Sequence, residues 1–234
     1  MDNILQINNL SKNYGKFQAL KNVTFNIPQG KIVGVLGPNG SGKTTLIKTI
    51  MGLLSSYQGE ISIAGEQPGP SANTHISYLP DRNHIPIWLT SKEAIAFFSD
   101  FYEDFDAARA KDMLQRMGIA PDKKIKTLSR GMQEKVQLVM VMSRRASLYV
   151  LDEPLGAVDP ASREFIINTI LKNFPEESSI LLSTHIIADI EPILDVAVFL
   201  RQGEIVLNDD VDKIREEKCM SLDELFREVF RNVY

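Results

Sequence analysis

One stretch of eight residues constrains this chain more than any other, Gly37-Pro38-Asn39-Gly40-Ser41-Gly42-Lys43-Thr44. It matches the pattern G-x-x-x-x-G-K-[ST] at every specified position. Glycines in such a loop let backbone N–H groups turn toward the oxygens of a phosphate chain. The lysine then contacts the β- and γ-phosphates, and the threonine hydroxyl is a ligand for Mg²⁺. The pattern therefore predicts a site for a nucleoside triphosphate.

The neighbours of this loop have the order that such a site requires. Residues 31–36 (KIVGVL) form a short apolar run that predicts a buried strand entering the loop. After Thr44, apolar residues recur at helical spacing until Gly52, which predicts a helix. The positive N-terminus of that helix would face the phosphates. A glycine-rich turn that binds nothing is the alternative, and this context disfavours it.

Composition limits the classes of protein to which the chain can belong. Its 234 residues suit one large α/β domain, or a core domain with a small inserted one. The net charge of -4 gives no electrostatic reason to expect nucleic acid as a partner. A single cysteine, Cys219, excludes an internal disulfide framework and fits a reducing cytosol. Because neither a signal peptide nor a long apolar stretch is present, we expect another chain to span any membrane involved.

Further strands are predicted on both sides of the loop. Residues 4–8 and 23–27 predict an antiparallel start before the parallel core, and 59–65 and 75–79 predict two more strands. Tyr14 stands just before Gly15 in the first of these regions. Its ring can stack on adenine or simply occupy a turn, and both interpretations stay open.

An aromatic segment follows at 86–128, and its pattern is mostly helical. A third of the eighteen aromatic residues of the chain lie between 88 and 105, namely Trp88, Phe97, Phe98, Phe101, Tyr102 and Phe105. They can form the small core of a helical subdomain. Some of them can instead remain exposed as a docking surface for a partner.

Two adjacent carboxylates, Asp152 and Glu153, follow the apolar run 148–151. Charges at the end of a buried strand are costly unless they meet a cation or take part in chemistry. Given the loop upstream, we expect Asp152 to hold Mg²⁺ and Glu153 to polarise the water that attacks the γ-phosphate. Two carboxylates in a solvated loop are the alternative.

Two other positions admit a functional and a purely structural interpretation. Ser129, within 128–133, can cap the helix that follows it, or its helix can receive a second phosphate at its N-terminus. His185 comes just after a strand predicted at 180–182, at the edge of a parallel sheet where ligands gather. A histidine that only supports the fold is the alternative.

Three elements are predicted after the two carboxylates. Asp159 and Pro160 predict the start of a helix that runs to about residue 173. A hairpin is expected over 196–200 and 204–207. The tail is amphipathic from residue 222 on, with one apolar face formed by Leu222, Leu225, Phe226, Val229, Phe230 and Val233. We expect this face to pack on its own domain; an intersubunit role is the alternative.

Taken together, these stretches resemble the ATP-binding subunit of an ABC transporter over nearly the whole chain. The similarity comprises a Walker A loop at 37–44, a signature motif at 128–133, a Walker B strand at 148–153, a D-loop around 156–159 and a switch histidine at His185. It implies an α/β fold: a P-loop NTPase core with a mainly parallel sheet and flanking helices, an N-terminal antiparallel β subdomain and an inserted helical subdomain. The single domain would cover 1–234, with the helical subdomain at 86–128 and a helical tail at 210–234.

The resemblance also implies a role for each residue. Tyr14 would stack on adenine, Glu153 would be the general base, and His185 would contact the γ-phosphate. Mg²⁺ would be served by Thr44, Asp152 and Asp81. The other ATP-binding residues would be Gly37, Pro38, Asn39, Gly40, Ser41, Gly42, Lys43, Thr44, Thr45 and, from a second subunit, Ser129 and Gly131. Two such domains would close head to tail around ATP, as a homodimer or as a heterodimer with a second ABC ATPase.

The sequence departs from the family pattern in three places. The signature L-S-G-G-Q is here LSRGM, with Arg130 and Met132, a variant similar to those of small bacterial ATPases that drive ABC-2-type exporters. Asp81 stands where most members have the Q-loop glutamine, and we expect it still to serve the metal or its water. The D-loop reads GAVD in place of SALD, which affects its first hydrogen bond across the dimer.

The leading hypothesis is an ATP-hydrolysing transport subunit with ATP and Mg²⁺ as cofactors. It would act in the cytoplasm, peripheral on the inner face of the cell membrane. It would power the export function of separate transmembrane permease subunits that dock on the aromatic segment. A soluble ABC ATPase acting on nucleic acid or ribosomes is the first alternative; such relatives carry paired ATP-binding units, coiled coils or zinc-binding cysteines. A small-molecule P-loop kinase is the second, and it would need an acceptor pocket and a lid.

Overall fold

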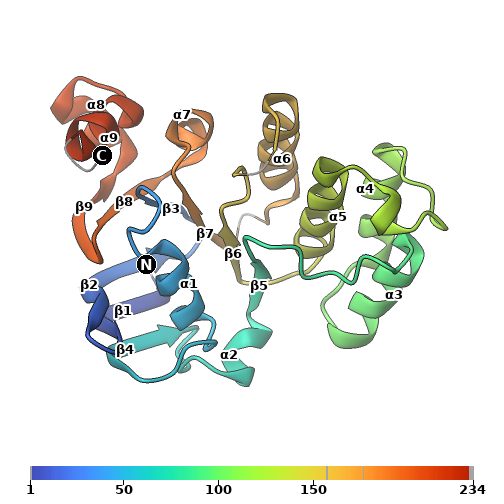
Figure 1. The fold of residues 1–234 in the computed structure, drawn as a ribbon, viewed down its shortest axis with the longest axis horizontal. Helices are drawn as coiled ribbons and strands as arrows, with labels where there is room; N and C mark the ends of the chain where they lie inside the picture. Colours follow the sequence, from blue (N-terminus) through green and yellow to red (C-terminus); the bar gives the residue numbers. More distant parts are fainter. Residues whose placement is uncertain (1, 157, 176, 232–234) are drawn as a thin grey trace.

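Two β-sheets that differ in strand direction form the framework of the protein (Figure 1). The computed structural model describes residues 2–156, 158–175 and 177–231. One sheet is antiparallel, with the strand order β2-β1-β4. The other has the order β5-β6-β7-β3-β8-β9, and its strands are parallel except at the edge, where β9 pairs antiparallel with β8.

The strands occupy both halves of the chain. Their bounds are β1 Asn3–Tyr14, β2 Phe17–Pro28, β3 Ile32–Leu36, β4 Tyr57–Ile63, β5 Ile76–Leu79, β6 Leu148–Asp152, β7 Ser179–Thr184, β8 Val196–Arg201 and β9 Glu204–Asp210. The four central strands of the larger sheet, β6, β7, β3 and β8, are almost entirely buried because both faces of this sheet are covered.

The helices lie between the strands and around them. Their bounds are α1 Lys43–Ile50, α2 Pro70–Thr74, α3 Ser91–Phe101, α4 Ala107–Arg116, α5 Arg130–Met142, α6 Pro160–Asn173, α7 Ile187–Ile190, α8 Val211–Lys218 and α9 Leu222–Phe230, with two 3₁₀ turns at Ile125–Thr127 and Glu191–Ile193. Helix α6 begins as expected, because Asp159 accepts a hydrogen bond from the Ser162 N–H at 3.0 Å and Pro160 fills the first helical position.

Helix α1 is packed between the two sheets. Its buried side chains Leu46, Ile47 and Ile50 share one apolar cluster with residues of β1, β2 and β4 and with Val33 and Val35 of β3. The opposite face of the larger sheet is covered by α5, α6, α7 and α9, which contribute to a second cluster. The sheet is thus a central layer, and the start of α1 is fixed at its carboxyl edge.

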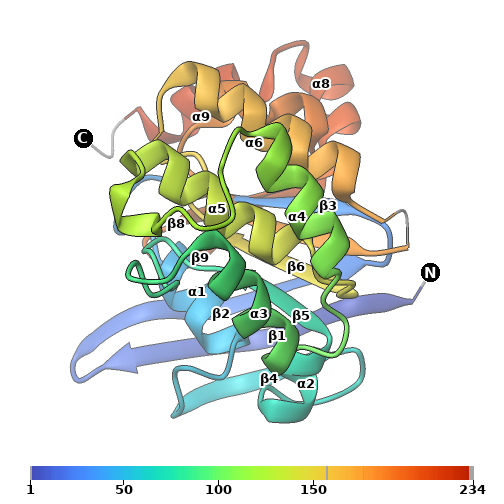
Figure 2. The same ribbon diagram turned by 90° about the vertical axis from the view of Figure 1, so that its right-hand side faces the viewer.

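A third apolar cluster lies outside the sheets, among α3, α4 and the middle of α5. These helices form a lobe beside the larger sheet in Figure 1, and α3, α4 and α5 come to the front when the molecule is turned in Figure 2. Thr90 caps α3 in a capping box with Glu93, and Asp106 caps α4. The division into a helical subdomain at 86–128 and a tail at 210–234 stays a proposal, and residues 232–234 lie outside those that the structure describes.

Buried Arg144 connects this lobe to the larger sheet. Its guanidinium contacts both carboxylate oxygens of Asp104 at 3.0 and 3.2 Å, and it also donates to the carbonyl oxygens of Ile76 and Thr74. The guanidinium carbon lies 4.0 Å from the centre of the Tyr102 ring. A buried cation with this many partners fixes the end of α3 against the start of β5.

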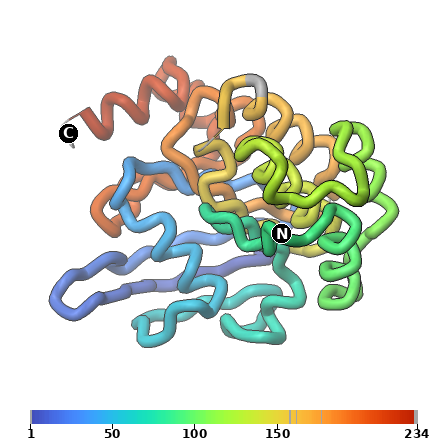
Figure 3. The backbone as a smooth tube through the Cα atoms, turned by 45° about the vertical axis from the view of Figure 1, so that its right-hand side comes forward, coloured from blue at the N-terminus to red at the C-terminus, as the bar shows by residue number. Residues whose placement is uncertain are grey.

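The predicted α/β class and the order of elements are confirmed, but the first two strands were predicted too short. Residues 4–8 and 23–27 are only parts of β1 and β2, which extend as a long hairpin past the rest of the sheet (Figure 3). Bulges interrupt their register, and Asn9 and Asn22 have positive φ angles of 50° and 48°. These irregularities break the alternation of apolar and polar residues that marks a strand in a sequence.

The last part of the chain packs on its own domain, as expected. Strands β8 and β9 form the predicted hairpin. Leu222, Leu225 and Phe230 of α9 are buried in the cluster that covers the larger sheet. Val233, also assigned to this apolar face, lies outside the described residues. Within the described part of the chain, none of the helices has the length and apolar character that a membrane crossing requires.

Candidate nucleotide site

The loop at 37–44 connects β3 to α1, and its shape depends on glycine. Gly40 and Gly42 have φ angles of 82° and 113°, in a region that residues with a side chain rarely adopt. At Gly37 a Cβ atom would lie 2.4 Å from the carbonyl oxygen of Leu200, so a side chain has no room. The backbone of the loop is therefore packed closely against its neighbours, and α1 starts at the end of the loop.

Lys43 is buried at the base of this loop, with 5% of its surface exposed. Its ammonium donates to the carbonyl oxygens of Gly37 and Pro38 at 2.7 and 3.2 Å. The same ammonium lies 3.1 Å from Oε1 of Glu153. Three oxygen atoms thus surround the cation, and the phosphates of a nucleotide would offer it oxygens of the same kind.

The carboxyl ends of β6 and β7 meet because the two strands are parallel, with Asp152 aligned with Ser183. Asp152 is fully buried, and its Oδ1 accepts a hydrogen bond from Ser183 Oγ at 2.6 Å. Thr44 Oγ1 lies 3.5 Å from the same oxygen. Burial is the main cause that raises the pKa of Asp152, and the nearby charge of Asp81 adds to it.

These residues fit a divalent cation. Oδ2 of Asp152 is buried without a hydrogen-bond partner among the described residues, so one oxygen of an acidic group is left for a cation. Thr44 and Asp152 would hold Mg²⁺, which prefers oxygen ligands and keeps several waters. In the described residues no three His, Cys, Asp or Glu side chains are grouped to hold a metal, so the phosphates would complete the coordination. The metal would neutralise charge on the phosphate oxygens.

Glu153 follows Asp152 with a strained backbone. Its φ angle of 50° is unusual for a residue with a side chain and costs on the order of 1–3 kcal/mol. Its N–H donates to the carbonyl oxygen of Ser183 at 3.0 Å, and Ser183 Oγ lies 3.1 Å from the same nitrogen. This anchored turn places the carboxylate beside Lys43.

His185 completes a chain of three polar side chains. Its Nδ1 lies 3.0 Å from Oε2 of Glu153, whose other carboxylate oxygen is the one next to Lys43. The histidine directly follows β7 and the glutamate directly follows β6, and these two strands are neighbours in the sheet. The structure thus brings together the three side chains that the sequence assigned to phosphate binding, base catalysis and γ-phosphate contact.

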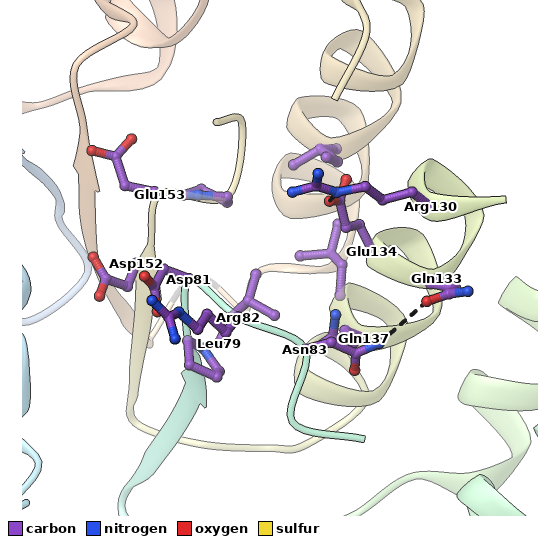
Figure 4. Close-up of a pocket in the computed structure, with 14 residues that line it drawn as sticks. Leu79, Asp81, Arg82, Asn83, Arg130, Gln133, Glu134, Gln137, Asp152 and Glu153 are labelled. Carbon is purple, nitrogen blue, oxygen red and sulfur yellow. Dashed lines mark hydrogen bonds and ion pairs between the residues drawn. The ribbon is translucent and has the colours of Figure 1, made fainter. Parts of the chain in front are cut away.

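Asp81 lies at the same edge of the sheet, two residues after the end of β5. It lines a cavity of about 340 Å³ together with Asp152 and Glu153 (Figure 4). On the other side of this cavity are Arg130, Gln133, Glu134 and Gln137 of α5. The structure therefore places Asp81, a predicted metal ligand, in the same cavity as Asp152 and Glu153, where the family pattern has an amide.

Tyr14 lies at the end of β1, with 48% of its surface exposed. It lines a second cavity, of about 420 Å³, which also contains Lys43, Asp81 and Glu153. The remaining lining residues are Phe17, Ala19, Asn39, Gly40, Gly42, Thr44 and Thr45. One cavity thus extends from the phosphate loop to the aromatic ring, and we call it the nucleotide cavity.

Ser129, Arg130 and Gly131, here called the signature turn, do not line the nucleotide cavity. Ser129 Oγ accepts a hydrogen bond from the Met132 N–H at 3.4 Å and thus caps α5. Arg130 is exposed and contacts Glu134 at 3.2 Å. The structure therefore leaves Ser129 and Gly131, the two predicted ATP-binding residues of this turn, outside the nucleotide cavity of the same chain.

Two contributors to the site were missed in the sequence. Ser183 holds both Asp152 and Glu153, but the strand predicted at 180–182 ended one residue before it. Phe17 lines the nucleotide cavity opposite Tyr14, and the short Gly15-Lys16 turn between two strands was an available signal for that pairing. Both omissions come from strands that were predicted too short.

A glycine loop between a buried strand and a helix, a buried lysine and two carboxylates on the next strands together define a P-loop nucleoside triphosphatase. The comparison with known families gives the particular group. The model of the ABC transporter family matches residues 20–156, more than half of the chain. The protein belongs to this family, and it is an ABC-type ATPase.

Relatives and solved structures agree with this assignment. An uncharacterized ABC transporter ATP-binding protein, YxlF of Bacillus subtilis, is 30% identical over 92% of this chain and 74% of its own. The SkfA peptide export ATP-binding protein SkfE of the same organism is 30% identical, with 92% of each chain covered. A solved structure of an ATP-binding subunit of an ABC transporter has a TM-score of 0.86 and 31% identity, covering 96% of this chain and 98% of the other.

Proposed function

We propose that this chain hydrolyses ATP to power separate transmembrane permease subunits, and that two copies, or one copy and a second ABC ATPase, sandwich the nucleotide. The observation that supports this most is the separation of the two predicted halves of the ATP site. The phosphate loop is preformed around Lys43, whereas Ser129, Arg130 and Gly131 do not line the nucleotide cavity, and exposed Arg130 lines the neighbouring cavity instead. A second subunit can supply the missing half.

Within one copy, each polar group has a distinct task. Lys43 exchanges the oxygens of Gly37, Pro38 and Glu153 for those of the β- and γ-phosphates. That exchange frees the Glu153 carboxylate to accept a proton from the attacking water. His185, in contact with the same carboxylate, stays beside the γ-phosphate. ATP binding therefore prepares the base as well as the substrate.

Gly131 supports closure by a second subunit. A Cβ atom at this position would lie 3.7 Å from Ser162 Oγ and 3.9 Å from Asp159 Oδ2, which is ordinary contact. The fold of the single chain thus has room for alanine, and glycine in a helix is less stable than alanine by about 0.5–1 kcal/mol. A close approach by the phosphates held in the second subunit would explain why this position is glycine.

An exposed aromatic surface on the helical lobe is suited to the permease. It consists of Ile87, Trp88, Phe97, Phe101 and Tyr102, and their exposed fractions range from 37% to 68%. Phe98, between them in sequence, is buried and packs against Tyr102 and Phe105 with ring centres 5.6 Å apart in both cases. The aromatic segment thus forms both a small core and an exposed patch, and such patches are typical of protein interfaces.

We further propose that the assembled machine is an exporter, with this subunit peripheral on the inner face of the cell membrane. The relative SkfE, which is named for peptide export, supports this direction. The variant signature LSRGM supports it as well, through the resemblance to ABC-2-type exporter ATPases.

The sandwich and the hydrolytic reaction can be tested together. We expect the wild type to release phosphate from ATP without an added acceptor, and Glu153→Gln to lose this activity by about 10²–10⁴-fold because the general base is gone. Light scattering should find Glu153→Gln as an ATP-dependent dimer and as a monomer without ATP. Phosphate transfer to a small molecule, or a Glu153→Gln chain that stays monomeric with ATP, would contradict the proposal.

The permease partner can be tested by co-purification with the membrane proteins encoded beside the gene. We expect association that is lost in the double variant Trp88→Ala, Phe101→Ala, whose side chains are two of the most exposed on the aromatic surface. Leu171→Ala, an exposed apolar residue on α6, is the control. No association of the wild type, with full ATPase activity alone, would count against a permease partner.

The role of Asp81 needs its own variant. We propose that it serves Mg²⁺ or its water, because it lies beside Asp152 and lines both cavities of the site. Asp81→Gln should raise the Mg²⁺ concentration that half-maximal ATPase activity requires, since an amide binds a hard cation more weakly than a carboxylate. Unchanged Mg²⁺ dependence and unchanged turnover would remove Asp81 from the metal site.

A further inference from the structure

The end of the β1–β2 hairpin presents two aromatic rings to the nucleotide cavity. Tyr14 and Phe17 are opposite each other in the register of the two strands, with only Gly15 and Lys16 between them in sequence. Directly opposed residues of antiparallel strands have their side chains on the same face. Both rings line the nucleotide cavity, and 48% of Tyr14 and 66% of Phe17 is exposed.

Buried Lys12 lies behind the Tyr14 ring. Only 7% of Lys12 is exposed, and its ammonium donates to the carbonyl oxygens of Ser55 and Ser56 in the turn before β4. The ammonium is 5.6 Å from the centre of the Tyr14 ring. None of the ion pairs found in the described residues involves Lys12. Carbonyl oxygens and an aromatic face are thus the groups that offset the burial of this charge.

This arrangement has a consequence for the ring. The cation is attracted to one face of Tyr14 and is itself fixed by two backbone carbonyls, so the ring is held at a fixed place at the end of β1. The opposite face is left for a planar ligand. A cation on one face also withdraws electron density from the ring, which favours stacking of an electron-rich base on the other.

Four of the polar side chains that line the nucleotide cavity are distant from Tyr14 and Phe17 in the sequence and are assigned to the phosphates or to the metal. Lys43, Thr44, Asp81 and Glu153 belong to the phosphate and metal end described above. The rest of the lining consists of the two rings and of Ala19, Asn39, Gly40, Gly42 and Thr45. Tyr14 and Phe17 are the groups in this lining that can contact the face of a base.

We propose that Phe17 is a second base-contacting residue and that Lys12 is the positioning residue that fixes the Tyr14 ring against the base. The ligand class is a purine nucleotide, recognised by the area of its two fused rings. Stacking of this kind is tolerant of base identity, so ATP and GTP should bind alike and pyrimidine nucleotides more weakly. The inference rests on the proposed function only in placing the phosphates of the nucleotide at 37–44.

The test separates base contacts from phosphate contacts. The full chain and its variants are titrated calorimetrically with ADP, GDP, UDP and inorganic pyrophosphate, none of which has a γ-phosphate to be hydrolysed. Phe17→Ala should weaken ADP binding by about 5- to 150-fold, the equivalent of about 1–3 kcal/mol per stacked base. Pyrophosphate affinity should stay unchanged, because the phosphate loop is intact.

Lys12 is tested by the same split. Lys12→Met keeps the apolar stem but removes the cation, and it should weaken ADP binding while leaving pyrophosphate binding unchanged; Lys12→Arg should restore part of the loss. Lys16→Met is the matched control, since Lys16 lies in the same hairpin but is exposed and does not line the cavity. Its ADP affinity should equal that of the wild type.

Three results would overturn the inference. ADP affinity that is unchanged in both Phe17→Ala and Lys12→Met would remove these residues from base recognition. A parallel loss of ADP and pyrophosphate binding would show that the variants act on the loop or on folding. UDP binding as tight as ADP binding would contradict recognition by ring area. A wild-type chain that binds neither ADP nor pyrophosphate would instead contradict the nucleotide site itself.

Discussion

The phosphate loop and the signature turn both lie at the N-terminus of a helix, but only the phosphate loop has its polar groups and glycines accounted for by contacts within its own chain. At the start of α1, Lys43 is buried among three oxygen atoms and the glycines are required by the backbone or by close neighbours. At the start of α5, Arg130 is exposed with one acidic partner, and Gly131 has room for a methyl group. The first region is shaped by its own chain, whereas the second has features that its own chain does not require.

The largest contrast is expected from replacing the cation in each region by methionine. Lys43→Met should weaken ATP binding by about 100-fold or more, because charge-assisted hydrogen bonds to the phosphates contribute about 1.5–3 kcal/mol each. Arg130→Met should leave the ATP affinity of a single copy unchanged within about twofold, because Arg130 lines the neighbouring cavity and not the one that contains Lys43 and Tyr14. Calorimetric titration at concentrations that keep the chain monomeric measures both. Equal losses in the two variants would erase the distinction.

The two glycines allow a second contrast, in stability. Gly37→Ala would place Cβ 2.4 Å from the Leu200 carbonyl oxygen and should lower the free energy of unfolding by about 1–3 kcal/mol. Gly131→Ala should raise it by about 0.5–1 kcal/mol, since alanine favours the helix. Urea denaturation of each variant gives these values. The ATPase activity of Gly131→Ala should nevertheless fall at least about tenfold if the turn meets phosphate closely. A stable and fully active Gly131→Ala would show that the turn is unconstrained.

A smaller effect is expected from Asp152, which lies at the end of β6 close to the phosphate loop and has one carboxylate oxygen without a hydrogen-bond partner among the described residues. Its pKa is raised in the folded chain, so its contribution to stability is fully present at low pH and is lost as the pH rises through the folded pKa. Asp152→Asn should therefore raise the melting temperature at neutral pH and show no gain at pH values below the ordinary pKa of aspartate. Thermal melts across pH in Mg²⁺-free buffer measure this. A variant that is less stable than the wild type at neutral pH would contradict the cost assigned to the buried carboxylate.

The contrast also explains what the sequence could predict. The fold class and the candidate site positions Lys43, Asp152 and His185 were accessible because buried strands, helix caps and a fixed motif have strong local patterns. The connection from Lys43 through Glu153 to His185 was not accessible, because it depends on the left-handed backbone at Glu153 and on where three side chains point. The pattern around Arg130 predicted a motif, but only the structure shows that the signature turn does not line the nucleotide cavity of its own chain.

In the aromatic segment, too, the sequence alone could not predict which side chains are buried. Its composition was compatible with a small core and with an exposed surface, and both are present. Phe98 is buried, whereas Trp88 and Phe101 are exposed, although all three are large and apolar. Which of them faces solvent is decided by the orientation of α3 against α4 and α5, and neighbours in the sequence do not encode that orientation.

The central claim is that one ATP site is made from two chains, and mixing two inactive variants tests it most directly. Lys43→Met has a damaged phosphate loop but an intact signature turn, and a chain with Ser129→Ala and Gly131→Ala has the reverse. Neither should hydrolyse ATP alone. A mixed dimer contains one intact site, formed by Lys43 of one chain and Ser129 of the partner subunit, so phosphate release should return to about a quarter of the wild-type rate for random pairing of equal amounts. A mixture that stays as inactive as its components, with mixed dimers demonstrated, would contradict the shared site.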